Sequence, residues 1–211
     1  MPPVTDSGKP AIKGIRFSNI FAESESGILI YGTETGGIQD LAFDRIKLRI
    51  KGGASSDAVG ENFDLRGSGG GLGTAIFKHD IPGMDCQYVD GLQIHGFDLE
   101  WEDNLPDYFS DGIHCEHFNN LTIDGFKGRQ AQKSGGGAKV ALRYGSKLSI
   151  RNCEVADRTG TFLSLEDVKD QRLFVNNDPS DAKQATAPAK LQFKTSFGNR
   201  LPATRSVSKD K

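Results

Sequence analysis

Polar and aromatic residues between positions 101 and 117 form the part of the sequence best suited to chemistry. Carboxylates beside an aromatic ring are typical of sugar sites, because the ring stacks on a sugar face while the carboxylates accept hydroxyl hydrogen bonds or transfer protons. The same composition fits a solvated acidic loop in which Trp101 covers the core. Carbohydrate contact, catalysis and a structural role therefore stay open for the candidate contact residues, which are Trp101, Asp103, Asp107, Tyr108, Asp111 and His114.

Metal binding is not expected from this cluster. His114 and His117 are three residues apart in a predicted strand, where alternate residues face opposite sides, so one ion cannot reach both imidazoles without a bend. Asp103, Asn104 and Asp107 offer oxygen ligands for Ca²⁺, but their spacing lacks the Asp-x-Asp-x-Asp-Gly form. We predict no metal and no cofactor.

Arg45 and Lys47 are a second candidate pair, for carboxylate recognition. If Ile46 points inward, both basic side chains point outward, as binding of a substrate carboxylate requires. The same Arg-Ile-Lys pattern also arises by chance in a half-buried strand with alternating polar and apolar residues.

A recurring six-residue phrase supplies the strands that would position these residues. The phrase has apolar residues at its first, third and sixth positions, and its copies start at Ile15, Leu41, Leu92, Leu121 and Leu148, with a weaker copy at Leu173. Successive copies start 25 to 29 residues apart, except for one interval of 51 residues, which is close to two periods. Further short apolar strands lie between the phrases, at residues 27–31, 84–86, 111–115, 138–142 and 161–165.

The alternation predicts half-buried strands, and a fixed period without helical segments predicts coils that stack in parallel. The sequence therefore predicts an all-β fold, a right-handed parallel β-helix of about six or seven coils with about 25 residues per coil. The fifth position of the phrase should form a left-handed bend, because Gly or Asn occupies it in most copies; Arg45 is the exception.

We expect residues 1–178 to form the coils, with loops at 52–73 and 101–110. Residues 179–211 carry seven Lys or Arg against two Asp, and this basic tail should cap the last coil or be disordered. An open first coil would be a sheet edge prone to association, although the oligomeric state itself is not predicted.

Composition excludes some functions. The 211 residues carry a net charge of -2, which gives no general electrostatic case for nucleic acid or an anionic membrane as a partner. The N-terminal segment has no signal-peptide pattern, and no apolar stretch reaches membrane-span length. Three cysteines cannot all pair within one chain, and their spacing fits no zinc or redox pattern, so we expect buried thiols at Cys86, Cys115 and Cys153.

Several segments together resemble a known family. Thr5–Ile20, Gly27–Gly32 and Gly37–Ile46, followed by the segments 76–83, 103–109 and 160–165, resemble the late coils of bacterial glycoside hydrolase family 28 proteins, the polygalacturonase-like pectin hydrolases. The likeness covers most of residues 5–178. It implies polysaccharide as partner, a pectic or related uronic-acid chain, and an extracellular or periplasmic location for the parent protein.

The catalytic motif set of that family is not present, because no Asn-x-Asp in this sequence precedes an Asp-Asp pair. The family hydrolyses its substrate by inversion with aspartates from Asn-x-Asp and Asp-Asp motifs, and this chain contains no Asp-Asp pair. Asp111-Gly-Ile-His114 resembles the family's Asp-Gly-Ile-Asp, with His114 in place of the second aspartate. The resemblance therefore implies part of a pectin-directed hydrolase whose catalytic coils are absent here; whether this chain is itself an enzyme stays open. The alternative is a non-catalytic carbohydrate-binding or structural β-helix module.

Overall fold

The computed structural model describes residues 12–34, 37–55, 80–131, 137–155, 158–180 and 182–187. Its named elements are all strands: β1 (Ile12–Ser24), β2 (Ile28–Tyr31), β3 (Ile38–Ile50), β4 (Met84–Trp101), β5 (Ile113–Asp124), β6 (Lys127–Gly128), β7 (Ala138–Arg143), β8 (Ser146–Arg151), β9 (Glu154–Val155), β10 (Thr161–Glu166), β11 (Lys169–Val175) and β12 (Gln184–Ala187).

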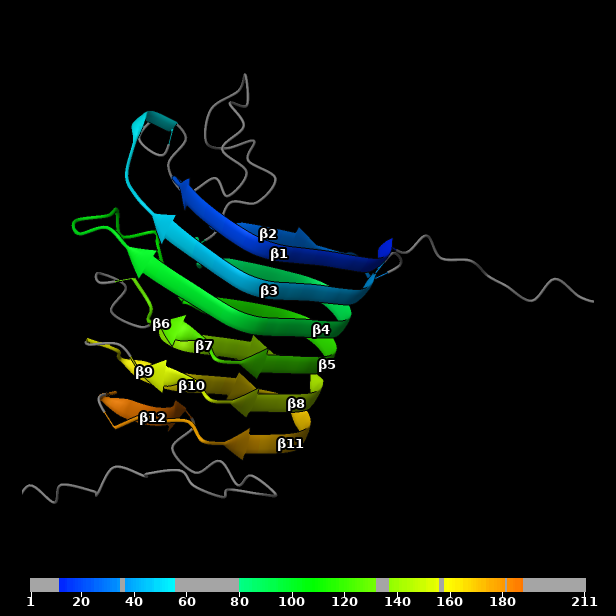
Figure 1. Ribbon diagram of the computed structural model, residues 1–211. Coiled ribbons are helices and arrows are strands. Elements are labelled where there is room, and N and C mark those ends of the chain that lie inside the picture. Colours follow the sequence, from blue (N-terminus) through cyan, green and yellow to red (C-terminus); the bar gives the residue numbers. More distant parts are fainter. Residues whose placement is uncertain are drawn as a thin grey trace, which may run out of the picture.

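The strands stack as a parallel β-solenoid of about five turns with about 27 residues per turn, with β1 and β2 at one end and β11 and β12 at the other (Figure 1). Every pairing between named strands is parallel, and one path of neighbours runs β1-β3-β4-β5-β7-β10-β12. The second series of short strands pairs in the predicted order, β2 with β4, β4 with β5, β5 with β7 and β7 with β10. The predicted β-helix is therefore confirmed, with fewer coils than expected.

The repeated phrase stacks in register and fills the solenoid lumen. Ile15, Leu41, Leu92, Leu121 and Leu148 form one inward row, and the third and sixth positions of the phrase form two more. From Leu41 onward these positions are at most 4% exposed. The fifth position has positive φ in every copy, at Asn19, Arg45, Gly96, Gly125 and Asn152. The predicted bend is thus confirmed, and Arg45 adopts it with φ 55° despite its side chain.

The last predicted copy is one residue out of place. The pairing of β11 with β8 shifts between Gln171 and Leu173, so that Phe174 rather than Val175 lies opposite Ile150. The bend then falls at Asn176, and Asn177 takes the inward slot below Cys153. The amide of Asn177 accepts from the Cys153 N–H and donates to the Ile150 carbonyl, each at 3.0 Å, which satisfies buried backbone groups at this end.

One strand lies within the predicted C-terminal tail. β12 follows residue 178 and pairs in parallel with β10. Residues 188–211 of the predicted tail and residues 56–73 of the first predicted loop lie outside the described residues. The described part of the chain contains no helix long and apolar enough to cross a membrane.

Candidate functional site

A polar cavity of about 370 Å³ lies on the outer face of the sheet formed by β4, β5 and β7. Gln87, Glu116 and Arg143 are register partners on three successive coils, so the cavity runs along the solenoid axis. Its lining is completed by Asp80, Pro82, Ser110, Asp111 and His114. Parallel stacking therefore brings together polar groups that are far apart in the sequence.

His114 is fixed between two carboxylates. Its Nδ1 lies 2.9 Å from Oδ1 of Asp85, which is fully buried in the neighbouring coil, and its Nε2 lies 3.2 Å from Oε1 of Glu116. Burial by itself would lower the pKa of His114, but the hydrogen bond and charge of Asp85, with the charges of Asp111 and Glu116, outweigh it and raise the pKa. The imidazolium therefore persists to higher pH than in a free histidine.

Arg143 closes the other side of the cavity. Its Nη1 lies 3.3 Å from Oε1 of Glu116 and its Nε 3.2 Å from Oε2 of Glu166, one coil further along. Since the Arg143 side chain is 49% exposed, these pairs contribute little to stability and leave guanidinium donors facing solvent.

Asp111 lies where the connection from β4 enters β5. Its Oδ1 accepts a hydrogen bond of 2.6 Å from the N–H of Ala138 on the next coil. Burial raises the pKa of the Asp111 carboxyl, against the lowering effect of this hydrogen bond and of the charges of His114 and Arg143. A carboxyl held in this way can act as acceptor or, when protonated, as donor toward a ligand in the cavity.

A row of stacked aromatic rings follows three of the cavity residues in sequence. Tyr88, His117 and Tyr144 directly follow the three cavity residues Gln87, Glu116 and Arg143 in sequence. The ring centroids of Tyr88 and His117 lie 4.5 Å apart with planes 7° apart, and those of His117 and Tyr144 lie 5.2 Å apart with planes 20° apart. All three residues have φ between 51° and 53°, a left-handed conformation that costs about 1–2 kcal/mol for a residue with a side chain. The stacking offsets part of that cost.

The predicted contact residues are divided by the fold. Asp111 and His114 line the cavity, whereas Trp101 is 9% exposed and donates from its indole N–H to the Arg129 carbonyl at 2.8 Å. Trp101 packs edge-on against Phe109, which is fully buried. Of the two interpretations left open for Trp101, the position of the ring fits the one in which it covers the core beneath a loop.

The other three predicted contact residues, Asp103, Asp107 and Tyr108, do not line the cavity. Asp103 is exposed, with its Oδ1 4.0 Å from Nη1 of Arg158, and Asp107 is exposed. Tyr108 is half-buried against the hydrophobic core, with its ring centroid 4.8 Å from that of Phe109. Within the described residues, no group of three or more His, Cys, Asp or Glu side chains could hold a metal ion.

Arg45 and Lys47 both point outward but are partnered within the chain. Nε of Arg45 donates to Oδ1 of Asn19 at 2.7 Å, and Nζ of Lys47 lies 2.6 Å from Oε1 of Glu100. The hydrogen bond and charge of Glu100 raise the pKa of Lys47. Since Glu100 supplies a carboxylate already, the geometry does not favour this pair as a carboxylate-binding site.

Sequence reasoning missed most of the cavity, although the repeat held the signal. Gln87, Glu116 and Arg143 are separated by 29 and 27 residues, which is the repeat period, and so are Tyr88, His117 and Tyr144. Aligning outward as well as inward positions of the repeat would have placed each trio in one row.

The fold defines this protein as a parallel β-solenoid with a polar cavity on its outer face. Comparison with protein-family models, with curated proteins and with solved structures found no match in any of the three.

Proposed function

We propose that the chain is a polysaccharide-binding β-solenoid module and that the glycan binds in the cavity lined by Asp111, His114, Glu116 and Arg143. The observation that carries the proposal is the cavity itself, in which carboxylate, imidazole, amide and guanidinium groups from three successive coils converge. Sugar hydroxyls both donate and accept hydrogen bonds, so a hydroxyl-rich ligand can use this mixed set. The stacked rings of Tyr88, His117 and Tyr144, each next in sequence to a cavity residue, would supply apolar contact to a longer glycan.

The charges of the cavity favour a neutral glycan segment over a uronic-acid chain. Three carboxylates line it, at Asp80, Asp111 and Glu116, with Asp85 beneath, against one guanidinium and one imidazole. A ligand carboxylate would add a further negative charge to this set, and like charges brought together are unfavourable. The pectic ligand implied by the family resemblance remains a prediction, and its uronate groups would need to lie next to Arg143.

Binding can be tested by calorimetric titration with neutral pectic galactan, xylan and polygalacturonate oligosaccharides. We expect the neutral oligosaccharides to bind more tightly, and both Glu116→Gln and Arg143→Gln to weaken binding at least tenfold. The matched control is Glu100→Gln, since Glu100 also pairs with a basic side chain, Lys47, but lies outside the cavity. Equal binding by all variants, or no binding to any oligosaccharide, would contradict the proposal.

Hydrolysis in the same cavity is a second candidate function, favoured by the position of Asp111. This half-buried carboxyl lines the cavity, and burial raises its pKa toward the protonated form that glycoside hydrolysis requires near the leaving oxygen. Release of new reducing ends by the wild type and its loss in Asp111→Asn would support this function. Binding without release would limit the protein to the binding role.

A further inference from the structure

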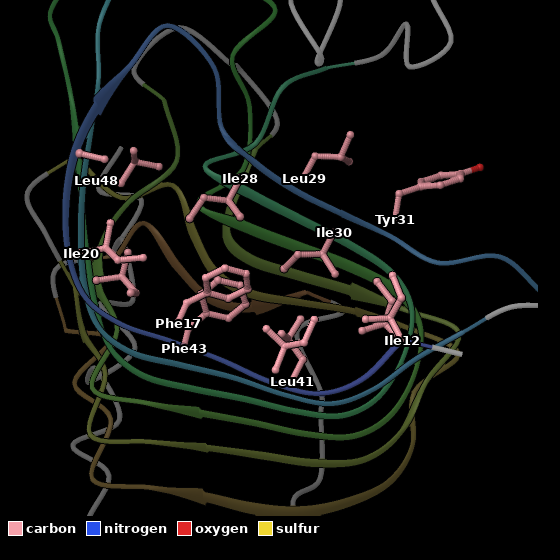
Figure 2. A pocket seen from close by; sticks show the side chains of 14 residues that line it. Ile12, Phe17, Ile20, Ile28, Leu29, Ile30, Tyr31, Leu41, Phe43 and Leu48 are labelled. Carbon is pink, nitrogen blue, oxygen red and sulfur yellow. The ribbon is translucent and has the colours of Figure 1, made fainter. Parts of the chain in front are cut away.

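The coil formed by β1 and β2 leaves an apolar end on the solenoid. Its lumen-facing side chains and those of β3 enclose an apolar cavity of about 450 Å³, in which Phe17 stacks on Phe43 with ring centroids 5.1 Å apart (Figure 2). Ile12, Ile15 and Phe17 are 56%, 37% and 41% exposed. Their counterparts on the second coil, Leu41 opposite Ile15 and Phe43 opposite Phe17, are buried because another coil lies on each side of them. Complete burial of such a side chain is worth about 1.5–3 kcal/mol, and the three on β1 are roughly half exposed, so covering each is worth about 1 kcal/mol and this end favours a partner.

The apolar surface continues over the rim onto the outside of the coil. Phe21 is 82% exposed and Tyr31 47% exposed, and Figure 2 shows Tyr31 on the side of β2 away from the lumen. The same outward rows on the following coils carry polar or charged residues, Lys47 and Asp98 beside Phe21 and Gln87 beside Tyr31. Among the described residues, the large apolar side chains classed as exposed all lie on β1 and β2, apart from Tyr144.

We propose that this end binds a second copy of the same chain, head to head, about a two-fold axis that is perpendicular to the solenoid and passes through the bend of β1. A two-fold contact must be self-complementary, because the same patch is used by both copies. Four of the cavity-lining residues of β1, Ile15, Phe17, Ile20 and Ala22, lie symmetrically about the point between Ser18 and Asn19; Ile12, which also lines the cavity, lies beyond this symmetric set. The left-handed bend at Asn19 lies beside that point, so the axis exchanges the two arms of the strand.

Antiparallel pairing of β1 with β1 of the second copy then matches like faces. Ile15 lies opposite Ala22, and Phe17 opposite Ile20, so the two lumens join into one core. On the outside Arg16 lies opposite Phe21, where a guanidinium can pack on the exposed ring. Lys13 and Glu23 lie opposite Ser24 and Gly14, so no like charges face each other. The pairing also satisfies the free backbone groups along the edge of β1.

The opposite end of the solenoid does not offer a matching apolar face in the described residues. Phe162 and Phe174 are 0% and 4% exposed there, and the polar Asn177 occupies the inward slot below Cys153. A head-to-tail contact would therefore place apolar side chains against a polar end, and would also continue as an open filament. The head-to-head contact covers the central apolar residues of β1 and stops at two copies.

The oligomeric state of the full chain tests this proposal by light scattering after size exclusion. We expect twice the chain mass of 22.9 kDa at micromolar concentration. Phe21→Lys and Arg16→Glu should each weaken association at least tenfold, since both side chains are on the outside and neither supports the core. Gln93→Lys is the matched control, because it adds the same charge as Phe21→Lys at an exposed strand position two coils away and should leave the dimer intact. A monomeric wild type, or assemblies that grow beyond two copies, would overturn the proposal.

Disulfide trapping tests the register separately. Directly opposite residues in an antiparallel pair have Cα atoms about 4.5–5.5 Å apart, within the range a disulfide spans. A mixture of Arg16→Cys and Phe21→Cys proteins should therefore form the mixed cross-linked dimer on mild oxidation. Arg16→Cys alone should not cross-link, because the two introduced thiols would lie roughly 16 Å apart along the strands. Cross-linking of Arg16→Cys alone would overturn the register; the native cysteines are buried and do not compete.

Discussion

Replacing Lys139 by methionine should remove a pH dependence from the stability of the solenoid. Lys139 is fully buried in the lumen, where its ammonium donates to the carbonyls of Phe126 and Glu154 and lies 4.7 Å from the centroid of the Phe126 ring. Burial lowers the pKa of Lys139 from its ordinary value of 10.5 to about 8. The difference corresponds to about 3 kcal/mol of unfavourable free energy for the charged form in the folded state.

The sign of the effect follows from proton binding. Between pH 8 and 10.5 the unfolded chain keeps the Lys139 proton while the folded chain loses it, so the free energy of unfolding rises with pH across this window. Below about pH 8 the lysine is charged in both states and its contribution is constant. The wild type should therefore gain up to about 3 kcal/mol from this group between pH 8 and 10.5, and Lys139→Met should gain nothing from it.

Urea unfolding at half-unit steps from pH 7 to 10.5 measures this difference, with fluorescence of the single tryptophan, Trp101, as the probe. Because other groups titrate in both proteins, the informative quantity is the stability of Lys139→Met minus that of the wild type. This difference should fall by about 3 kcal/mol across the window, whatever its value at pH 7, where loss of the donor to two carbonyls also counts. Lys127→Met, at an exposed lysine, is the control and should show no such change. Parallel pH curves for Lys139→Met and the wild type would refute the reasoning.

Three further predictions concern other parts of the fold. Because the pKa of His114 is raised, its charged form stabilises the folded state fully below about pH 6.5, and this contribution is lost as pH rises through the folded-state pKa. In urea titrations the stability difference between wild type and His114→Gln should therefore shrink as pH rises. A difference that does not change with pH would contradict the assignment. Gly96→Ala should cost about 1 kcal/mol in thermal unfolding, because φ is +63° but the nearest atom to an added Cβ is 3.8 Å away. Gly112→Ala should destabilise the fold several times more than Gly96→Ala, because its Cβ would lie 2.5 Å from the Lys139 carbonyl oxygen. Equal losses of stability in the two variants would show that steric room at Gly112 is not limiting. The native chain should not react with a thiol reagent until it unfolds, and rapid labelling would contradict the burial of Cys86, Cys115 and Cys153.

The sequence by itself determined the rows of the solenoid. A side-chain period of two within each phrase and a period of about 25 residues between phrases leave one arrangement that brings the repeated apolar positions together, namely parallel stacking in register. The bends followed in the same way, because Gly and Asn adopt left-handed backbone angles at low cost. Arg45 shows that the register forces the bend even where the side chain disfavours it.

The tertiary structure alone decided which outward residues meet. Asp85 and His114 are 29 residues apart and lie in strands that look alike in sequence, and only the stacking of one coil on the next places Oδ1 of Asp85 2.9 Å from Nδ1 of His114. The residue type of Trp101 did not by itself decide that its ring is buried. A buried indole N–H needs an acceptor, and the Arg129 carbonyl of a later segment supplies it.

Lys139 shows the same limit in the core. A lysine beside Val140 in an alternating strand is expected to face solvent, yet its row neighbour in the previous coil is Gly112, which has no side chain to fill the lumen. Lys139 is nevertheless fully buried, its ammonium lies over the Phe126 ring, and the carbonyls of Phe126 and Glu154 accept hydrogen bonds from it. The local sequence pattern determines on which side of a strand most residues lie. The burial and charge of exceptions such as Lys139 are determined by contacts between coils, because these contacts join residues that are far apart in the sequence.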